Sequence, residues 1–328
     1  MLLMVFLILD IFLGSVSIRP SEVIDALFRH TGSNFETIIL KFRLPKAITA
    51  LVVGVALSLS GLQMQTVFRN PMAGPYVLGI SSGASLGVAF VILGFSSGMT
   101  LDSLHGLGNW ILVVASWVGA GAVMLLIMII SSKVKDIMTV LILGIMLSSG
   151  ISAVVTIMQY FSNETMLKAY VIWTMGSLGN LTSDQLNVLL ISVSAGAILS
   201  LFSSKWLNAL LLGENYATSI GLNVKFARTI IFVCTSILAG SVTAFCGPIG
   251  FIGIAVPHIA RILFRTSDHK VLIPGTILAG GTIMLISDII SQLPGSESIL
   301  PVNAVTSLIG IPVVIWVIFR NRKYSGSF

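Results

Sequence analysis

The stretch Leu-Leu-Gly-Glu-Asn-Tyr-Ala-Thr-Ser-Ile-Gly-Leu, residues Leu211–Leu222, interrupts a chain that otherwise consists of long apolar runs. Its small residues Gly213, Ala217 and Gly221 are spaced four positions apart. On a helix these residues would share one face beside Glu214 and leave a smooth groove there. A second protein can press against such a groove, so we expect this segment to receive a partner that drives the chain.

The apolar runs on both sides of this stretch predict an all-α polytopic membrane protein. Hydrophobic residues make up 55% of the 328 residues and charged residues 9%, whereas a soluble domain has about 25% charged residues. A membrane-spanning helix needs about 20 mostly apolar residues. Because the polar gaps are short, we expect one transmembrane domain over residues 1–328, with a cytoplasmic coupling segment at about 205–225. Ten spans fit the sequence: 1–17, 46–67, 76–95, 109–131, 138–161, 186–204, 226–246, 249–265, 271–293 and 300–319.

The distribution of Lys and Arg predicts the orientation. Ten spans place both termini on one side, and the tail Arg320-Asn321-Arg322-Lys323 marks that side as cytoplasmic. On this assignment 12 of the 18 basic residues face the cytoplasm. The first span carries Asp10 and no preceding basic residue, so we expect it to be retained rather than cleaved as a signal peptide. Five of the other six basic residues crowd into the first external segment: Arg19, Arg29, Lys41, Arg43 and Lys46.

Two similar segments predict an inverted repeat. Ala73–Ile80 (AGPYVLGI) opens the third span and Cys246–Ile254 (CGPIGFIGI) opens the eighth. On the topology above, the third span runs outward and the eighth runs inward. Paired segments of opposite sense are typical of transporters with a pathway between two halves. A chance similarity stays open as the alternative, because Gly and Pro are frequent in membrane helices.

Small and polar residues in the third span suggest two different roles. Gly79, Gly83 and Gly87 have the small-x-x-x-small spacing that permits close approach of helices in lipid. Beside them, Ser81 and Ser82 have hydroxyl groups that can line a polar pathway. Helix packing and a pathway role are both open for this segment.

Ionisable residues and cysteines inside the spans are expected to be structural. Asp10, His258 and Asp288 are functional candidates by position, but Asp288 lies near the outer end of the ninth span and Arg261 near the inner end of the eighth, which argues against a relay. Cys234 and Cys246 lie in one apolar span, which fits neither a disulfide framework nor a metal site. We therefore expect polar contacts from the first three and packing roles for both cysteines.

Catalytic motifs are missing from the sequence. It has no Gly-x-x-x-x-Gly-Lys-Ser/Thr loop for nucleotide phosphates, no His-Glu-x-x-His, no Gly-x-Ser-x-Gly and no clustered carboxylate pair. We expect no enzymatic activity, no cofactor and no metal site. The net charge of +6 reflects the bias of basic residues toward the cytoplasm and anionic headgroups, so nucleic acid is not an expected partner.

Several longer motifs follow one another along the chain. They are Arg43-Leu44-Pro45-Lys46, Gly61–Gln65 with Asn70–Gly79, Gly213–Gly221, Gly250–Arg261, Asp268–Pro274 and Leu300–Pro312. In this order they resemble the permease subunits of the iron-chelate, haem and cobalamin class of binding-protein-dependent ABC importers. The resemblance covers essentially the whole chain. It implies a type II ABC importer permease with ten helices, working by ATP-driven alternating access in the bacterial inner membrane.

The resemblance also implies partners and site residues. It implies a homodimer with a central pathway, an external substrate-binding protein, and two separate ATP-binding subunits docked on the loop between the sixth and seventh spans. Arg43 and Lys46 would meet acidic residues of the binding protein, since opposite charges steer docking; an ordinary external loop is the alternative. The coupling residues would be Gly213, Glu214, Ala217 and Gly221, and the pathway residues Ser81, Ser82 and Thr139.

Departures from the family pattern concern the outer rim and the substrate. Lys46 and Gln292 stand where many relatives have Arg, and Ile299 and Asn303 depart from a Glu-Leu-Pro-x-Gly motif, so we expect different docking chemistry there. Ferric siderophore is the expected substrate on the breadth of the family alone, with haem and cobalamin as alternatives. An ion-coupled secondary transporter using Asp10 is the alternative from another class.

Overall fold

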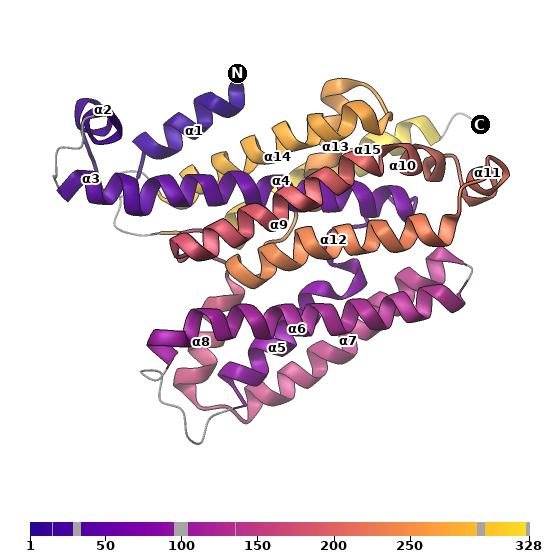
Figure 1. The fold of residues 1–328 in the computed structure, drawn as a ribbon, viewed down its shortest axis with the longest axis horizontal. Coiled ribbons are helices and arrows are strands. Elements are labelled where there is room, and N and C mark those ends of the chain that lie inside the picture. Colours follow the sequence, from indigo (N-terminus) through magenta and orange to yellow (C-terminus); the bar gives the residue numbers. More distant parts are fainter. Residues whose placement is uncertain (15, 29–33, 95–103, 135, 294–298, 326–328) are drawn as a thin grey trace.

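The helices of this protein form two groups that run along a common direction (Figure 1). The structure is a computed structural model, which describes residues 1–328 except 15, 29–33, 95–103, 135, 294–298 and 326–328. The first group contains α1, α4, α9 and α12–α15, and the second contains α5–α8. Helices α2, α3 and α8 lie at one end of the molecule, the α3 end, and α10 and α11 lie at the other, the α11 end.

Each of the ten predicted spans corresponds to one helix. Among the described residues, six helical stretches are long and apolar enough to cross a bilayer, and four shorter apolar helices complete the set. The ten helices are α1 (Leu2–Phe12), α4 (Leu44–Val67), α5 (Ile80–Ile92), α6 (Leu104–Lys133), α7 (Ile137–Tyr160), α9 (Ser183–Phe202), α12 (Val224–Cys246), α13 (Ile252–Phe264), α14 (His269–Ser291) and α15 (Val302–Ser325).

Short helices connect the spans, and the sequence predicted only the one within Leu211–Leu222. They lie at the two ends of the molecule, except for η2, which precedes α5. The π-helical turn η1 joins α3 directly to α4, so the second span extends at its start to Asn34. The short helices are α2 (Pro20–Phe28), α3 (Asn34–Ile38), η1 (Ile39–Arg43), η2 (Pro75–Leu78), α8 (Glu164–Thr174), α10 (Ser204–Leu211) and α11 (Glu214–Ser219).

Glycines set the distance between the central helices. On α4, a Cβ added to Gly54 would lie 2.2 Å from the Gly280 carbonyl oxygen of α14. On α5, added Cβ atoms on Gly83 and Gly87 would lie 2.5 Å and 2.0 Å from backbone oxygens of α6. In lipid, such close backbone approach replaces the hydrophobic drive that packs helices in water. The predicted packing role of the α5 glycines is confirmed.

The two similar segments occupy equivalent positions in the fold. Each precedes a short helix, α5 or α13, and a residue with positive φ stands directly before each helix: Gly79 at 79° and Phe251 at 64°. The chain leads α5 toward the α3 end and α13 toward the α11 end. The segments also touch, since a Cβ on Gly253 would lie 2.5 Å from Cδ of Pro75. This arrangement supports the predicted inverted repeat.

A buried polar cluster joins α4, α9 and α12 in the middle of the first group. The Gln63 amide donates to Ser200 Oγ at 2.8 Å and to Cys234 Sγ at 3.2 Å, and its oxygen accepts from Thr235 at 2.9 Å. Both Cys234 and Cys246 are buried free thiols, which confirms their expected packing role. A buried amide with all these partners fixes the relative rotation of the three helices.

Candidate coupling and docking sites

Helix α10 anchors the loop between α9 and α12 to the body of the protein. Its Leu207 and Leu210 are buried, whereas Asn208 on another face reaches α14. The Asn208 amide donates to Asp268 Oδ1 at 2.6 Å, and Asp268 also caps α14 by accepting from the backbone N–H of Lys270. The Lys270 backbone N–H and then the Asn208 amide lower the pKa of Asp268, because both stabilise its ionised form.

His269 extends this contact to α4. Asn208 Oδ1 lies 2.7 Å from His269 Nδ1, and Thr66 Oγ1 lies 2.8 Å from Nε2. Because the Asn208 oxygen can only accept, Nδ1 carries the proton at that contact, while Nε2 lies within hydrogen-bond distance of the Thr66 hydroxyl. One imidazole therefore connects α10, α14 and α4 at the α11 end.

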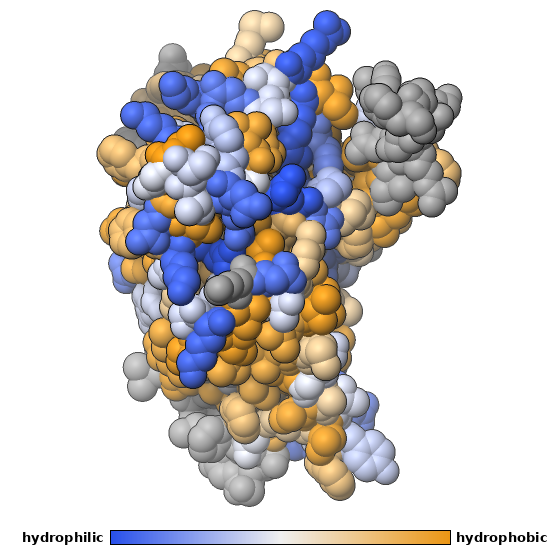
Figure 2. Space-filling view, turned by 90° about the vertical axis from the view of Figure 1, so that its right-hand side faces the viewer, coloured by the Kyte–Doolittle hydropathy of each residue, from blue (hydrophilic) through white to orange (hydrophobic). Residues whose placement is uncertain are grey.

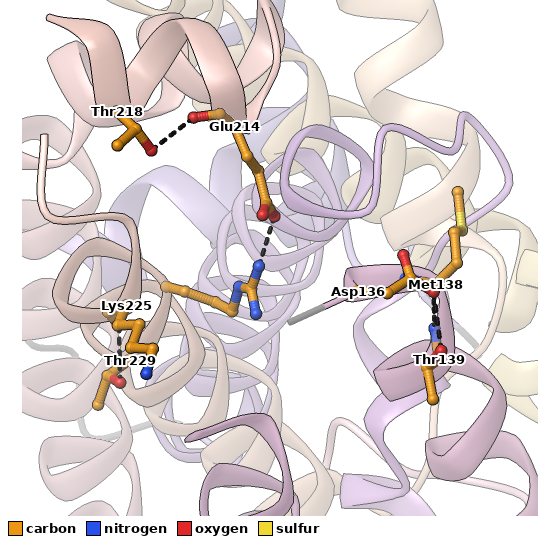
Figure 3. A network of polar contacts seen from close by, with 8 residues as sticks. Asp136, Met138, Thr139, Glu214, Thr218, Lys225 and Thr229 are labelled. Atoms are coloured by element: carbon orange, nitrogen blue, oxygen red, sulfur yellow. Dashed lines mark hydrogen bonds and ion pairs between the residues drawn. The ribbon is translucent and has the colours of Figure 1, made fainter. Parts of the chain in front are cut away.

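An ion pair fixes α11 to α12. Glu214, the first residue of α11, binds Arg228 of α12 through one short contact (Figure 3). The Arg228 side chain is only 6% exposed, whereas that of Glu214 is 33% exposed. A guanidinium buried to this extent needs a carboxylate partner, so Glu214 holds the start of α11 in a defined position.

The start of α7 lies beside the same pair. Asp136 caps α7 by accepting from the backbone N–H groups of Met138 and Thr139 at 3.2 Å and 3.0 Å, and from Thr139 Oγ1 at 2.7 Å (Figure 3). The Thr139 hydroxyl, these two N–H groups and the charge of Arg228 lower the pKa of Asp136. The charge of Arg228 therefore acts on both Glu214 of α11 and Asp136 at the start of α7.

The predicted small-residue groove on a helix face is wrong. Helix α11 contains only Glu214–Ser219, and Gly213 and Gly221 lie outside it with φ of 112° and 85°. Ala217 is fully buried and faces the protein, not solvent. The glycines bound the helix because they adopt backbone conformations that residues with a Cβ rarely adopt.

The surface that α11 offers instead is formed by residues that sequence reasoning missed. Tyr216 is 47% exposed and Ile220, directly after the helix, is 56% exposed. The Ile220 N–H donates to the Tyr216 carbonyl at 3.2 Å, so the helical turn continues past Ser219 and both side chains lie on one side, as their spacing of four positions in the sequence indicates. Exposed apolar side chains on a protruding turn of helix are typical of a protein contact surface.

The predicted pathway residues lie at two different levels. Ser81 and Ser82 are half-buried in the first turn of α5, where Ser82 Oγ donates to the Gly79 carbonyl at 3.0 Å. Thr139 lies in the first turn of α7, at the α11 end, and its hydroxyl is engaged by Asp136. The structure thus does not bring the three together, although Thr139 belongs to α7, the least buried of the six long apolar stretches.

Arg43 points inward toward the end of α1. Its guanidinium donates to the carbonyl oxygens of Ile11 at 3.1 Å and Phe12 at 2.9 Å, and also to that of Val16. The side chain is buried and fills the space beside Gly14. Arg43 therefore caps the carbonyl end of α1, where a cation is favourable.

Lys46 takes part in a polar cluster near the α3 end. Its Nζ lies 3.0 Å from Asp288 Oδ1, and its side chain remains 18% exposed. The Gln292 amide bridges two carboxylates, donating to Asp288 Oδ2 at 2.9 Å and to Asp10 Oδ1 at 3.0 Å. Asp10 and Asp288 thus make the structural contacts expected of them, and Gln292 joins α14 to α1.

An open cavity of about 890 Å³ lies next to this cluster. Lys46, Gln292 and Ile299 contribute to its wall. Asn303, another departure from the family pattern, accepts from the Gly250 N–H at 2.9 Å and so holds α15 to the turn before α13. His258 also makes its expected structural contact, with Nε2 2.8 Å from the Pro71 carbonyl oxygen.

Comparison with known proteins identifies this helical arrangement. The sequence profile of the FecCD transport family matches residues 2–320. The chain belongs to this family. Within it, the chain is 34% identical to an ABC transporter permease protein of Methanocaldococcus jannaschii, with 93% of this chain and 90% of the relative covered. FecCD proteins are membrane-spanning transport components, so this chain is an ABC importer permease.

Relatives named for different cargoes are equally similar to this FecCD protein. It is 35% identical to the vitamin B12 import system permease protein of Salmonella paratyphi A, covering 88% of this chain and 85% of the relative. It is also 35% identical to the hemin transport system permease protein of Yersinia pestis, with coverage of 87% and 84%. A solved inward-facing metal-chelate type ABC transporter matches with a TM-score of 0.83 at 28% identity, covering 97% of this chain and 96% of that one.

Proposed function

We propose that this FecCD permease imports a metal chelate across the bacterial inner membrane, with ferric siderophore as its substrate. The relatives named for vitamin B12, hemin and metal chelates support this class of cargo. Haem and cobalamin are the alternatives within the class. Both termini and α11 face the cytoplasm in this proposal, as the bias of basic residues favours.

The observation that carries the proposal is the anchored, protruding α11 (Figure 1). A second copy of the permease completes the pathway, and two separate ATP-binding subunits dock on the two α11 helices of this dimer. The ATPase activity belongs to these subunits, because the sequence has no phosphate-binding loop. The exposed Tyr216 and Ile220 support α11 as the contact surface, with Gly213 and Gly221 bounding it.

Two routes carry motion of α11 into the membrane. One runs through the Glu214–Arg228 pair into α12, and the other runs from α10 through Asn208 and His269 into α14 and α4. The ATP-bound and nucleotide-free partners shift the permease between states only if they contact these states differently. Because both ends of the loop are held by direct contacts, a shift of α11 is transmitted to the membrane helices α4, α12 and α14.

An external binding protein delivers the chelate at the α3 end. Arg43 and Lys46 both line the outer cavity, and Lys46 is the more accessible docking charge, since its side chain is 18% exposed. Arg43 contributes by holding α1 against α4. The pathway residues stay proposals, with Ser81 and Ser82 on α5 and Thr139 at the entrance of α7.

Uptake by proteoliposomes tests this function. The permease is reconstituted with its ATP-binding subunits and binding protein, and a ferric siderophore, haem and cobalamin are offered in parallel. ATP-dependent uptake of the siderophore supports the proposal, whereas uptake of only haem or cobalamin selects the corresponding alternative. Uptake that follows an imposed proton or sodium gradient and ignores ATP contradicts it and favours a secondary transporter.

A further inference from the structure

A second cavity, of about 830 Å³, is separate from the outer cavity beside Lys46. It lies at the α11 end, and three guanidinium groups line it: those of Arg69, after α4, and of Arg261 and Arg265, near the end of α13. Neither the Lys46–Asp288 pair nor the Glu214–Arg228 pair of the described residues involves any of these arginines. The wall therefore carries a positive charge that no carboxylate of the described chain offsets.

The cationic wall is held in place by hydrogen bonds to neutral groups. Arg261 Nη1 donates to Gln65 Oε1 at 2.6 Å, and the Gln65 amide donates to the Ile254 carbonyl at 3.0 Å. His258 lies against the Pro71 carbonyl and so fixes the turn that follows Arg69. A fixed guanidinium loses little freedom when an anion binds, which favours binding.

The backbone at the other two arginines is also unusual. Arg69 and Arg265 have φ of 47° and 49°, and each follows the end of a helix. Glycine or asparagine is the usual residue in this left-handed conformation. Here the conformation carries two long cationic side chains to the wall of a single cavity.

The chemistry of the wall selects a phosphate group. Planar guanidinium groups bind phosphate oxygens through paired hydrogen bonds, and several of them stabilise its negative charge. Leu211, Ile262 and Val317 form apolar parts of the same wall, and Leu263, which follows Ile262 on α13, is 65% exposed. Seen from the α11 end, hydrophilic side chains gather over the upper part of the face, among apolar ones (Figure 2).

We propose that this cavity binds the phosphate group of an anionic phospholipid, with the acyl chains lying against the neighbouring apolar surface. The lipid comes from the cytoplasmic leaflet, where anionic headgroups are abundant; this placement rests on the proposed function. A Cβ on Gly213 would lie 3.5 Å from Arg69 Nη1, so the occupied cavity reaches the start of α11. Bound lipid therefore stabilises the position of the coupling helix.

Lipid binding to the purified permease dimer in detergent tests the proposal, by native mass spectrometry with phosphatidylglycerol, phosphatidylcholine and inorganic phosphate as separate probes. The variants are Arg69→Gln with Arg265→Gln, and Arg265→Gln alone in case the pair fails to fold. Lys205→Gln, an exposed charge at the same end outside the cavity, is the matched control. Basic residues near a membrane surface contribute about 1 kcal/mol each, so the dissociation constant for phosphatidylglycerol rises about 30-fold in the double variant and about 5-fold in the single one.

Several outcomes overturn the proposal. Unchanged phosphatidylglycerol binding in Arg265→Gln, or an equal loss in Lys205→Gln, removes the site. Saturation by inorganic phosphate without phosphatidylglycerol binding makes the ligand a free anion, and equal binding of phosphatidylcholine removes the role of net charge. Displacement of the lipid when the ATP-binding subunits assemble assigns the cavity to that interface. Lipid binding is measured without transport, so a failure of the uptake assay would contradict the proposed function but not the lipid site.

Discussion

Removing the carboxylate of Glu214 is expected to uncouple the permease from its ATPase. In Glu214→Gln the Arg228 guanidinium loses its charged partner while its side chain stays 94% buried, since it is 6% exposed in the native protein. Breaking a fully buried pair costs about 3–5 kcal/mol. Because Glu214 is 33% exposed, solvent screens the pair, and we expect a cost of about 1–2 kcal/mol.

This cost weakens the docked position of α11 more than it weakens the fold. A change of about 1–2 kcal/mol reduces the population of that position about 5- to 30-fold, while α12 remains packed along its length. The assay measures substrate imported per ATP hydrolysed in proteoliposomes that contain the complete importer. We expect that ratio to fall at least about 5-fold, with the ATPase still active.

Two further variants make the result specific. Glu164→Gln removes an exposed carboxylate at the opposite end and should leave the ratio unchanged. Exchanging the charges, Glu214→Arg with Arg228→Glu, should restore part of the coupling, as expected for a direct pair. A folded Glu214→Gln importer that transports with the native ratio would refute the proposed role of this ion pair.

The remaining predictions concern α11, the α3 end and pH. Gly221→Trp should fold, because no atom lies within 4 Å of the added Cβ, but it should uncouple transport, because a bulky residue does not readily adopt φ of 85°. Gly221→Asn should retain function. Normal uptake by the folded Trp variant would contradict the role of Gly221. Arg43→Met should lower the melting temperature, because the variant loses hydrogen bonds to α1 that contribute about 2–4 kcal/mol. Lys46→Glu should weaken capture of the binding protein, and more at low than at high salt. Unchanged capture at both salt concentrations would exclude docking by Lys46. The pKa values of Asp136 and Asp268 are lowered in the folded protein, so their contacts stabilise the fold fully above pH 3.8, and this stabilisation is lost as pH falls through the lowered pKa values. Asp268→Asn should therefore make the melting temperature fall less steeply at acid pH. An unchanged acid dependence of the melting temperature would contradict this assignment.

The apolar runs predicted the ten spans because membrane helices must satisfy their backbone hydrogen bonds locally. Spacing alone misled at Gly213–Gly221, where small residues four apart suggested a helix face. Glycine also ends helices, and here two glycines with positive φ bound a helix of six residues. The distinction depends on the backbone path, which a repeat of small residues does not specify.

Long-range contacts explain why the sequence did not predict the positions of Arg43 and Lys46. Arg43 and Lys46 belong to a basic segment of the sequence, but their side chains contact α1 and α14, which are distant in the sequence. The π-helical turn η1 joins α3 to α4 and places Arg43 beside the carbonyl end of α1. Nothing local to Arg43 in the sequence indicates that partner, although the short first helix leaves carbonyl groups that need one.

The most direct test of the central claim is cargo accumulation by the permease dimer in vesicles with and without its ATP-binding subunits. We expect accumulation against a gradient only when those subunits and ATP are present, and none when Tyr216 and Ile220 on the contact surface of α11 are replaced by aspartate. Accumulation by the dimer alone, or by the complete importer without ATP, would contradict the account.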